Sequence, residues 1–149
     1  MDMVILIGIQ GSGKSTLYRR QFFETHLRLS LDMLKTRHRE KRLVEACIAA
    51  RQRIVIDNTN VGRDERARFL RLARDGGFRT QGYFFEPVPE RALEWNRQRT
   101  GKAVIPVAGV LGTLKRLERP TWAEGFDELF RVTVDDDGAF VIDEWRAGG

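Results

Sequence analysis

The sequence has little cysteine, no long apolar run and no internal repeat or low-complexity tract. Its single cysteine, Cys47, excludes an intramolecular disulfide and any zinc knuckle built on cysteines. The longest clean apolar stretch, Met3 to Ile9, is too short to cross a bilayer. That stretch also lacks the basic leader and small-residue cleavage site of a secretory signal. We therefore expect a soluble, cytoplasmic protein with no membrane partner.

The composition is that of a folded domain. The chain has 149 residues, of which 42% are hydrophobic and 32% charged, so we expect one domain over residues 1–149. Lysine and arginine number 26 against 21 acidic residues, for a net charge of +5. Most of the cations are arginine, a bias that genome base composition alone can produce. The net charge by itself therefore favours an anionic partner only weakly.

Up to residue 85, short continuous apolar segments alternate with segments whose apolar residues have helical spacing. This alternation of expected strands and helices is typical of a parallel sheet with right-handed crossovers. Strands are expected at Met3–Gly8, Leu27–Ser30, Arg53–Ile56 and Phe78–Phe85. Helices are expected at Lys14–Phe23, Leu31–Gln52, Gly62–Arg74, Pro89–Arg99 and Pro106–Glu118. Leu129–Val134 and Ala139–Ile142 flank a turn, Asp135-Asp136-Asp137-Gly138, that is typical of a hairpin. The sequence therefore predicts an α/β fold with a C-terminal hairpin.

A phosphate-binding motif follows the first expected strand. Residues 8–15, Gly-Ile-Gln-Gly-Ser-Gly-Lys-Ser, match G-x-x-x-x-G-K-[ST] in full, between a buried strand and a helix. Its glycines let successive backbone N–H groups point inward at a phosphate, and the helix N-terminus adds partial positive charge. A purely structural glycine turn would not require the Lys-Ser pair. We expect ATP phosphates to be bound by Gly8, Gln10, Gly11, Ser12, Gly13, Lys14, Ser15 and Thr16.

The loop alone does not define the reaction. The N-K-x-D guanine motif of a switch GTPase is absent from the sequence. A motor or AAA-type ATPase would need more chain and an acidic pair after the third strand, where this sequence has Asp57-Asn58. A compact kinase that acts on a small acceptor or on a polynucleotide fits the length best.

Three further residues are candidates for the chemistry. Phosphoryl transfer to a hydroxyl needs a carboxylate near the acceptor oxygen, and Asp32 follows the second expected strand. Asp32 could equally cap the next helix. Asp57 ends the third strand, where it could hold a water on the Mg²⁺ that Ser15 binds directly, or form an Asx turn. Arg99 ends a cation-rich helix that could act as a lid over the transferring phosphate.

Taken together, these motifs resemble the kinase domain of 5′-polynucleotide kinases, which is found in phage end-healing enzymes and in animal polynucleotide kinase-phosphatases. The likeness runs from about Met3 to Phe130. It is carried by the phosphate loop, Asp32, the block Val55-Ile56-Asp57-Asn58-Thr59-Asn60, Asn96-x-x-Arg99, Lys102-Ala103-Val104-Ile105-Pro106-Val107 and the tail Arg119-Pro120-Thr121-Trp122-Ala123-Glu124-Gly125-Phe126.

The resemblance implies a role for each matching residue. Asp32 matches the general base, Lys14 and Ser15 match the phosphate and Mg²⁺ ligands, and Arg99 matches the lid arginine. Thr59 and Val104 fall where the family contacts its acceptor nucleotide. The resemblance also implies a parallel sheet with strand order 2-3-1-4-5 and a helical lid. The substrate would be the 5′-hydroxyl end of DNA or RNA, phosphorylated from ATP with Mg²⁺.

The sequence departs from this family on the acceptor side. Ser30-Leu31 stand where the family often has Asn-Arg, and Lys35 stands where it often has an arginine that grips the acceptor phosphate. Lys35 and Arg37 are then the candidate acceptor contacts, although lysine cannot form a bidentate fork. Two alternatives therefore remain: a kinase for a nucleoside, sugar or antibiotic hydroxyl, and a non-catalytic ATP-binding module.

Overall fold

The computed structural model describes residues 1–97 and 106–146, and its central feature is one mixed sheet. The strands are β1 (Asp2–Ile7), β2 (Leu27–Leu29), β3 (Ile54–Asp57), β4 (Arg79–Phe85), β5 (Glu128–Val134) and β6 (Phe140–Glu144). Their order is β2-β3-β1-β4-β5-β6, with β6 antiparallel to β5 and the other pairs parallel. The expected order 2-3-1-4-5 and the C-terminal hairpin are both confirmed.

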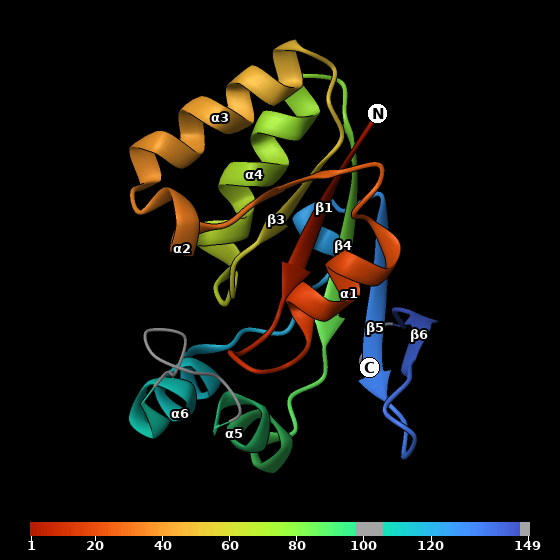
Figure 1. Ribbon diagram of the computed structural model, residues 1–149. Coiled ribbons are helices and arrows are strands. Elements are labelled where there is room, and N and C mark those ends of the chain that lie inside the picture. Colours follow the sequence, from red (N-terminus) through yellow and green to blue (C-terminus); the bar gives the residue numbers. More distant parts are fainter. Residues whose placement is uncertain (98–105, 147–149) are drawn as a thin grey trace.

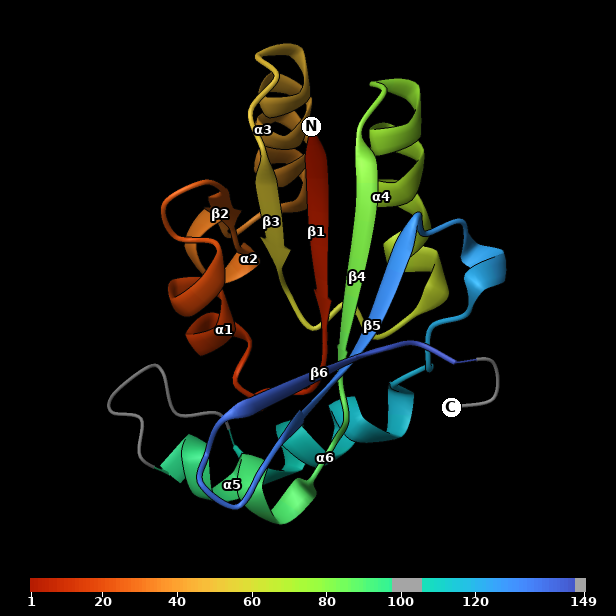
Figure 2. The same ribbon diagram turned by 90° about the vertical axis from the view of Figure 1, so that its right-hand side faces the viewer.

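Helices cover both faces of this sheet and its carboxyl end. They are α1 (Lys14–Gln21), α2 (Leu31–Leu34), α3 (Arg37–Ala49), α4 (Arg63–Asp75), α5 (Pro89–Arg97), α6 (Val107–Arg116) and the short 3₁₀ helix η2 (Trp122–Glu124). Helices α3 and α4 lie on one face and α1 on the other, while α5 and α6 lie beyond the carboxyl ends of the strands (Figures 1 and 2). Within the described ranges, every helix is too short or too polar to span a membrane.

Strand β1 is at the centre of the core because both of its faces are covered. Met3 and Ile5 pack with residues of α3 and α4, while Val4 and Leu6 pack with residues of α1. All four side chains are fully buried. Each apolar side chain buried in this way contributes roughly 1.5–3 kcal/mol. This packing supports the loop that follows β1 at the carboxyl edge.

The helix expected over Leu31–Gln52 is wrong as a single element. The structure breaks it into α2 and α3 at Lys35, whose φ is 74°, a positive value that interrupts a helix. Thr36 then caps α3, since its side chain accepts a hydrogen bond from the Arg39 N–H. The break leaves α2 as a single turn at the carboxyl edge of the sheet, and α2 carries Asp32.

Candidate active site

The loop over residues 8–13 joins β1 to α1 at the carboxyl edge of the sheet. Gly11 and Gly13 have φ values of 76° and 97°, a region that side-chain-bearing residues rarely adopt. At Gly8 the constraint is space, because an added Cβ would lie 2.8 Å from the Ser12 Oγ. The motif glycines are therefore required by the shape of the loop. Its two ends are the last residue of a buried strand and the N-terminus of a helix, as a phosphate-binding loop needs.

The Lys14 ammonium lies over the loop and not out in solvent. It donates hydrogen bonds to the carbonyl oxygens of Gly8 and Ile9, at 2.9 and 2.8 Å. The loop is also attached to the segment that follows β3, since the Gly8 N–H donates to the Thr59 carbonyl at 3.0 Å. The ammonium is thus held where the phosphates of a nucleotide would lie against the loop.

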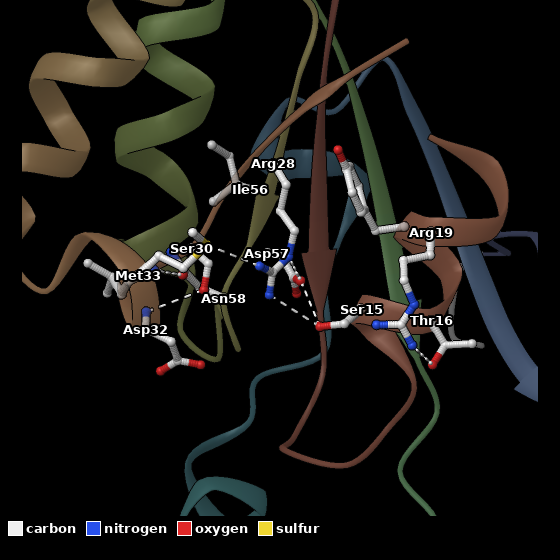
Figure 3. A network of polar contacts seen from close by, with 12 residues as sticks. Ser15, Thr16, Arg19, Arg28, Ser30, Asp32, Met33, Ile56, Asp57 and Asn58 are labelled. Atoms are coloured by element: carbon white, nitrogen blue, oxygen red, sulfur yellow. Dashed lines mark hydrogen bonds and ion pairs between the residues drawn. The ribbon is translucent and has the colours of Figure 1, made fainter. Parts of the chain in front are cut away.

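Three charged or polar side chains from three elements meet beside the loop (Figure 3). The Ser15 hydroxyl donates to the Asp57 carboxylate at 3.0 Å. The guanidinium of Arg28, on β2, donates from Nε to the same carboxylate oxygen at 2.6 Å, and from Nη2 to the Ser15 Oγ at 3.3 Å. The Asp57 side chain is only 3% exposed, so its charge needs a partner, and Arg28 provides one.

The Ser15 and Asp57 oxygens fit a magnesium ion. Both are hard oxygen donors of the kind that Mg²⁺ prefers, and they lie next to the phosphate loop. The structure places a cationic group, the Arg28 guanidinium, against both of them. The structure therefore brings together Ser15 and Asp57, the two residues expected from the sequence to hold Mg²⁺, and their oxygens already bind a cationic group.

Asp32 lies at the same edge of the sheet, on the first turn of α2 (Figure 3). Its side chain is exposed, and its backbone N–H donates to the Ser30 side chain at 3.3 Å. Ser30, and not Asp32, therefore caps α2, and the Asp32 carboxylate is exposed at the carboxyl edge of the sheet.

The expected acceptor contacts have different surroundings. Lys35 is exposed at the C-terminal end of α2, and Thr59 is half-buried on the loop after β3. The Arg37 guanidinium is already paired, with Glu40 at 2.8 Å and Glu65 at 3.4 Å. Arg99 and Val104 lie outside the described residues, so their expected roles stay predictions.

A cavity of about 260 Å³ lies against the phosphate loop, beside β4 and β5. Since β2 and β4 lie on opposite sides of β1, this is the other side of the sheet's centre from Asp32, which follows β2. The cavity is lined by the loop, the end of β4 and the strand β5, through Gly11, Ser12, Phe85, Glu86, Val88, Arg91, Arg131, Val132, Thr133 and Val134. Glu86 accepts hydrogen bonds from Arg119 and Arg131. Burial acts to raise the pKa of Glu86, but these two guanidinium groups hold it below its ordinary value. Glu86 is therefore ionised at neutral pH.

Helix α6 contacts the phosphate loop directly. The Gln10 amide donates to the Thr113 hydroxyl at 2.9 Å, and Ile9 packs against Val110 in a small apolar cluster. The Gln10 Oε1 atom is buried without a hydrogen-bond partner among the described residues. The loop is thus supported by α6 as well as by the sheet.

Sequence reasoning missed three charged residues that the structure places in or near this site. Arg28 lies in the strand expected at Leu27–Ser30 and Glu40 in the helix expected at Leu31–Gln52, and neither was a candidate site residue. Arg66, in α4, is fully buried and pairs with Glu124. Glu40 and Arg66 lie within runs of charged residues, so nothing in the sequence separates them from charges that face solvent.

The arrangement defines a class of protein. A phosphate loop after the central parallel strand, with an acidic residue at the end of the neighbouring strand, is the site of a P-loop nucleoside-triphosphate-binding fold of the kinase type. Residues 3–120 match the AAA domain family, and the chain belongs to that family. This match corrects the expectation that the chain is not of AAA type, which rested on its length and on Asp57-Asn58 in place of an acidic pair after β3.

Two curated relatives are polynucleotide phosphatase/kinases by name. The chain is 26% identical over 135 residues to "Bifunctional polynucleotide phosphatase/kinase" of Schizosaccharomyces pombe, covering 88% of this chain and 33% of that protein. A mimivirus protein of similar name is 25% identical over 153 residues, covering 97% of this chain and 36% of its own length. The chain thus spans about a third of the length of these relatives.

Solved structures share the fold at lower identity. Kti12 of Chaetomium thermophilum, in complex with ADP-AlF3, aligns with a TM-score of 0.67 at 18% identity, covering 91% of this chain and 90% of that one. A gluconokinase of Sinorhizobium meliloti aligns with a TM-score of 0.60 at 19% identity, covering 89% and 82%. These likenesses confirm the P-loop kinase fold.

Proposed function

We propose that this protein is an ATP- and Mg²⁺-dependent kinase that transfers the γ-phosphate to the 5′-hydroxyl end of a polynucleotide. The observation that carries the proposal is the meeting of three functional groups at one sheet edge. The phosphate loop follows β1, the Ser15–Asp57 pair joins α1 to β3, and Asp32 follows β2. An exposed carboxylate beside a donor-phosphate site is what transfer to a hydroxyl requires.

In this mechanism Asp32 accepts the proton of the acceptor hydroxyl as its oxygen attacks the γ-phosphorus. The new O–P bond forms in line with the bond that breaks, and ADP leaves with that bonding pair. Lys14 and Arg99 stabilise the negative charge that spreads over the transferring group. Ser15, and Asp57 through a water, would hold Mg²⁺, which neutralises charge on the donor phosphates.

The cavity beside Gly11 and Ser12 is the proposed place of the donor nucleoside. It lies next to the phosphate loop, on the other side of the sheet's centre from Asp32. A nucleotide bound along the loop would place its nucleoside in this cavity and its γ-phosphate toward Asp32. Donor and acceptor would then approach the site from opposite sides, as in-line transfer requires.

The polynucleotide acceptor rests on two supports. Both curated relatives carry polynucleotide phosphatase/kinase in their names, and they match most of this chain. The Asp57-Asn58-Thr59-Asn60 block also resembles the polynucleotide kinase family. In the structure each of its first two side chains makes a contact at the site: Asp57 with Ser15, and Asn58 with the first turn of α2.

A kinase for a small hydroxyl compound is the second candidate. The observation that favours it is the pairing of Arg37 with Glu40 and Glu65, which uses a cation that a nucleic-acid strand would otherwise bind. The gluconokinase shows that this fold is used for such an acceptor. Of the two basic residues expected to bind a phosphate of a polynucleotide acceptor, Lys35 and Arg37, only Lys35 is then exposed without an ion pair to Glu40 or Glu65.

The deciding experiment supplies γ-labelled ATP and Mg²⁺ with matched acceptors. These are DNA and RNA oligonucleotides with 5′-hydroxyl ends, the same oligonucleotides with 5′-phosphates, common nucleosides and gluconate. We expect label on the 5′-hydroxyl oligonucleotides alone. Transfer only to nucleosides or gluconate would establish the second candidate, and ATP turnover with no dependence on any acceptor would refute both.

A further inference from the structure

A chain of hydrogen bonds connects Glu40 in α3 to the first turn of α2 through Asn58. The Asn58 side-chain Nδ2 donates to the Glu40 Oε2 at 2.8 Å. The Asn58 Oδ1 accepts from the Leu31 backbone N–H at 2.9 Å. Leu31 directly precedes Asp32, so one asparagine side chain bridges α3 to the turn that carries the expected base.

Glu40 is an unusual residue to find at this place in the fold. Its side chain is only 3% exposed, and a buried carboxylate is costly unless it is paired and hydrogen-bonded. Arg37 supplies the pairing charge, at 2.8 Å from the Glu40 Oε1. Asn58 occupies the other oxygen. The charge of Arg37 is thus directed inward to Glu40.

The carboxylate determines which way the Asn58 amide faces. An ionised carboxylate can only accept hydrogen bonds, so it binds the NH₂ end of the amide. The carbonyl end must then face α2, where the Leu31 N–H needs an acceptor because it lies at a helix N-terminus. With the amide reversed, two donors would face each other at Leu31. Glu40 therefore selects the one orientation that attaches α2 to β3.

We propose that Glu40 and Asn58 are positioning residues that hold Asp32 at a set distance from the phosphate loop. Asn58 directly follows Asp57, so a single chain segment carries both the Asp57 contact with Ser15 and the attachment of α2. Neither residue needs to touch the acceptor. This inference rests on the proposed function, because it assigns a purpose to the position of the proposed base.

The test uses two variants and a matched control. Asn58→Ala removes the acceptor for the Leu31 N–H. Glu40→Gln keeps the volume of the side chain but can bind the Asn58 amide in either orientation. The control is Glu65→Gln, which changes the other, longer contact of Arg37 and leaves Asn58 untouched. Thermal unfolding of each variant confirms that it is folded.

The first readout is hydrogen exchange at the Leu31 amide, which does not depend on any activity. We expect exchange to accelerate by roughly tenfold in Asn58→Ala, the scale of one hydrogen bond, and by less in Glu40→Gln. Glu65→Gln should exchange as the wild type does. Wild-type protection of Leu31 in both variants would overturn the attachment.

The second readout separates transfer from donor binding. Misplacing a reacting group by about 1 Å can cost on the order of 10²-fold in rate, so kcat should fall toward that scale in Asn58→Ala. The Kd for ATP should stay within about twofold, because a positioning role leaves the donor site intact. Accelerated exchange at Leu31 with unchanged kcat would refute the positioning role. Failure of the proposed function would instead appear in the wild type, as an absence of transfer.

Discussion

The Arg28 guanidinium and the Asp57 carboxylate form an ion pair inside the candidate active site, with Nε and Oδ2 2.6 Å apart. The same guanidinium donates to the Ser15 hydroxyl. A cation that belongs to the protein therefore lies against both oxygen donors that the site offers to Mg²⁺. In the proposed function, the Mg²⁺ held by Ser15 and, through a water, by Asp57 would compete with Arg28 for these oxygens, because two cations repel each other at short range.

The first prediction concerns Arg28→Met. Without divalent cations, the variant should lose roughly 2 kcal/mol of stability, because a buried carboxylate loses its charged hydrogen-bond partner. Adding Mg²⁺ without nucleotide should raise the melting temperature of the variant by more than that of the wild type. Arg79→Met, which removes an exposed pair with Glu128, is the control. Equal Mg²⁺ effects on variant and wild type would contradict the competition.

Arg99→Ala tests the lid arginine. If Arg99 stabilises charge on the transferring phosphoryl group, its removal should lower kcat by a factor on the order of 10³, by analogy with arginine fingers. Arg97→Ala is the matched control, since Arg97 is exposed and pairs with Glu94 one turn away. Single-turnover transfer rates measure both. If Arg99→Ala lowers the transfer rate by less than a few-fold, Arg99 does not stabilise the transferring phosphoryl group and is an ordinary surface cation.

Glu124→Ala tests a pair that supports the loop after β3. Arg66 is fully buried, binds Glu124 at 2.8 Å, and donates to the Asn60 and Val61 carbonyls. Removing the carboxylate leaves a buried charge unpaired, which should cost about 3–5 kcal/mol of unfolding free energy. Denaturant unfolding measures this loss. Glu128→Ala, at an exposed pair, should cost under about 1 kcal/mol, and a similar cost for both would be inconsistent with the structure.

Glu86→Gln tests a dependence of stability on pH. Arg119 and Arg131 hold the pKa of Glu86 below its ordinary value in the folded protein. The stability that this carboxylate contributes is therefore present above its unfolded pKa of about 4.3, and it is lost as the pH falls through the lowered folded pKa. Melting temperatures of wild type and variant should converge as the pH falls below that range. A difference that stays constant from neutral to acid pH would refute this linkage.

Much of the fold could be predicted from the sequence because β1 and β3 are continuous apolar runs that end in chemically distinctive residues. The phosphate loop followed from a motif whose spacing is dictated by backbone geometry. The break between α2 and α3 was not visible, because Lys35 adopts a positive φ without the glycine that normally marks it. Thr36 was the available signal, as a residue suited to cap a new helix.

The contacts that connect the site could not be predicted in the same way. Arg28 meets Asp57 across 29 positions of sequence, and Arg66 meets Glu124 across 58. Whether an arginine lies in solvent or against a buried carboxylate depends on tertiary packing, and helical periodicity does not report it. In a chain with 26 lysines and arginines, few of these residues stand out by sequence alone.

The role of Asp32 is the centre of this account, and one measurement tests it most directly. Wild type and Asp32→Ala are each given γ-labelled ATP and a 5′-hydroxyl oligonucleotide, and terminal label and ATP affinity are measured together. We predict that the variant binds ATP with a nearly unchanged Kd and transfers no detectable label, because the proton acceptor is gone while the phosphate loop is intact. Transfer by Asp32→Ala at the wild-type rate would contradict the assignment of the base.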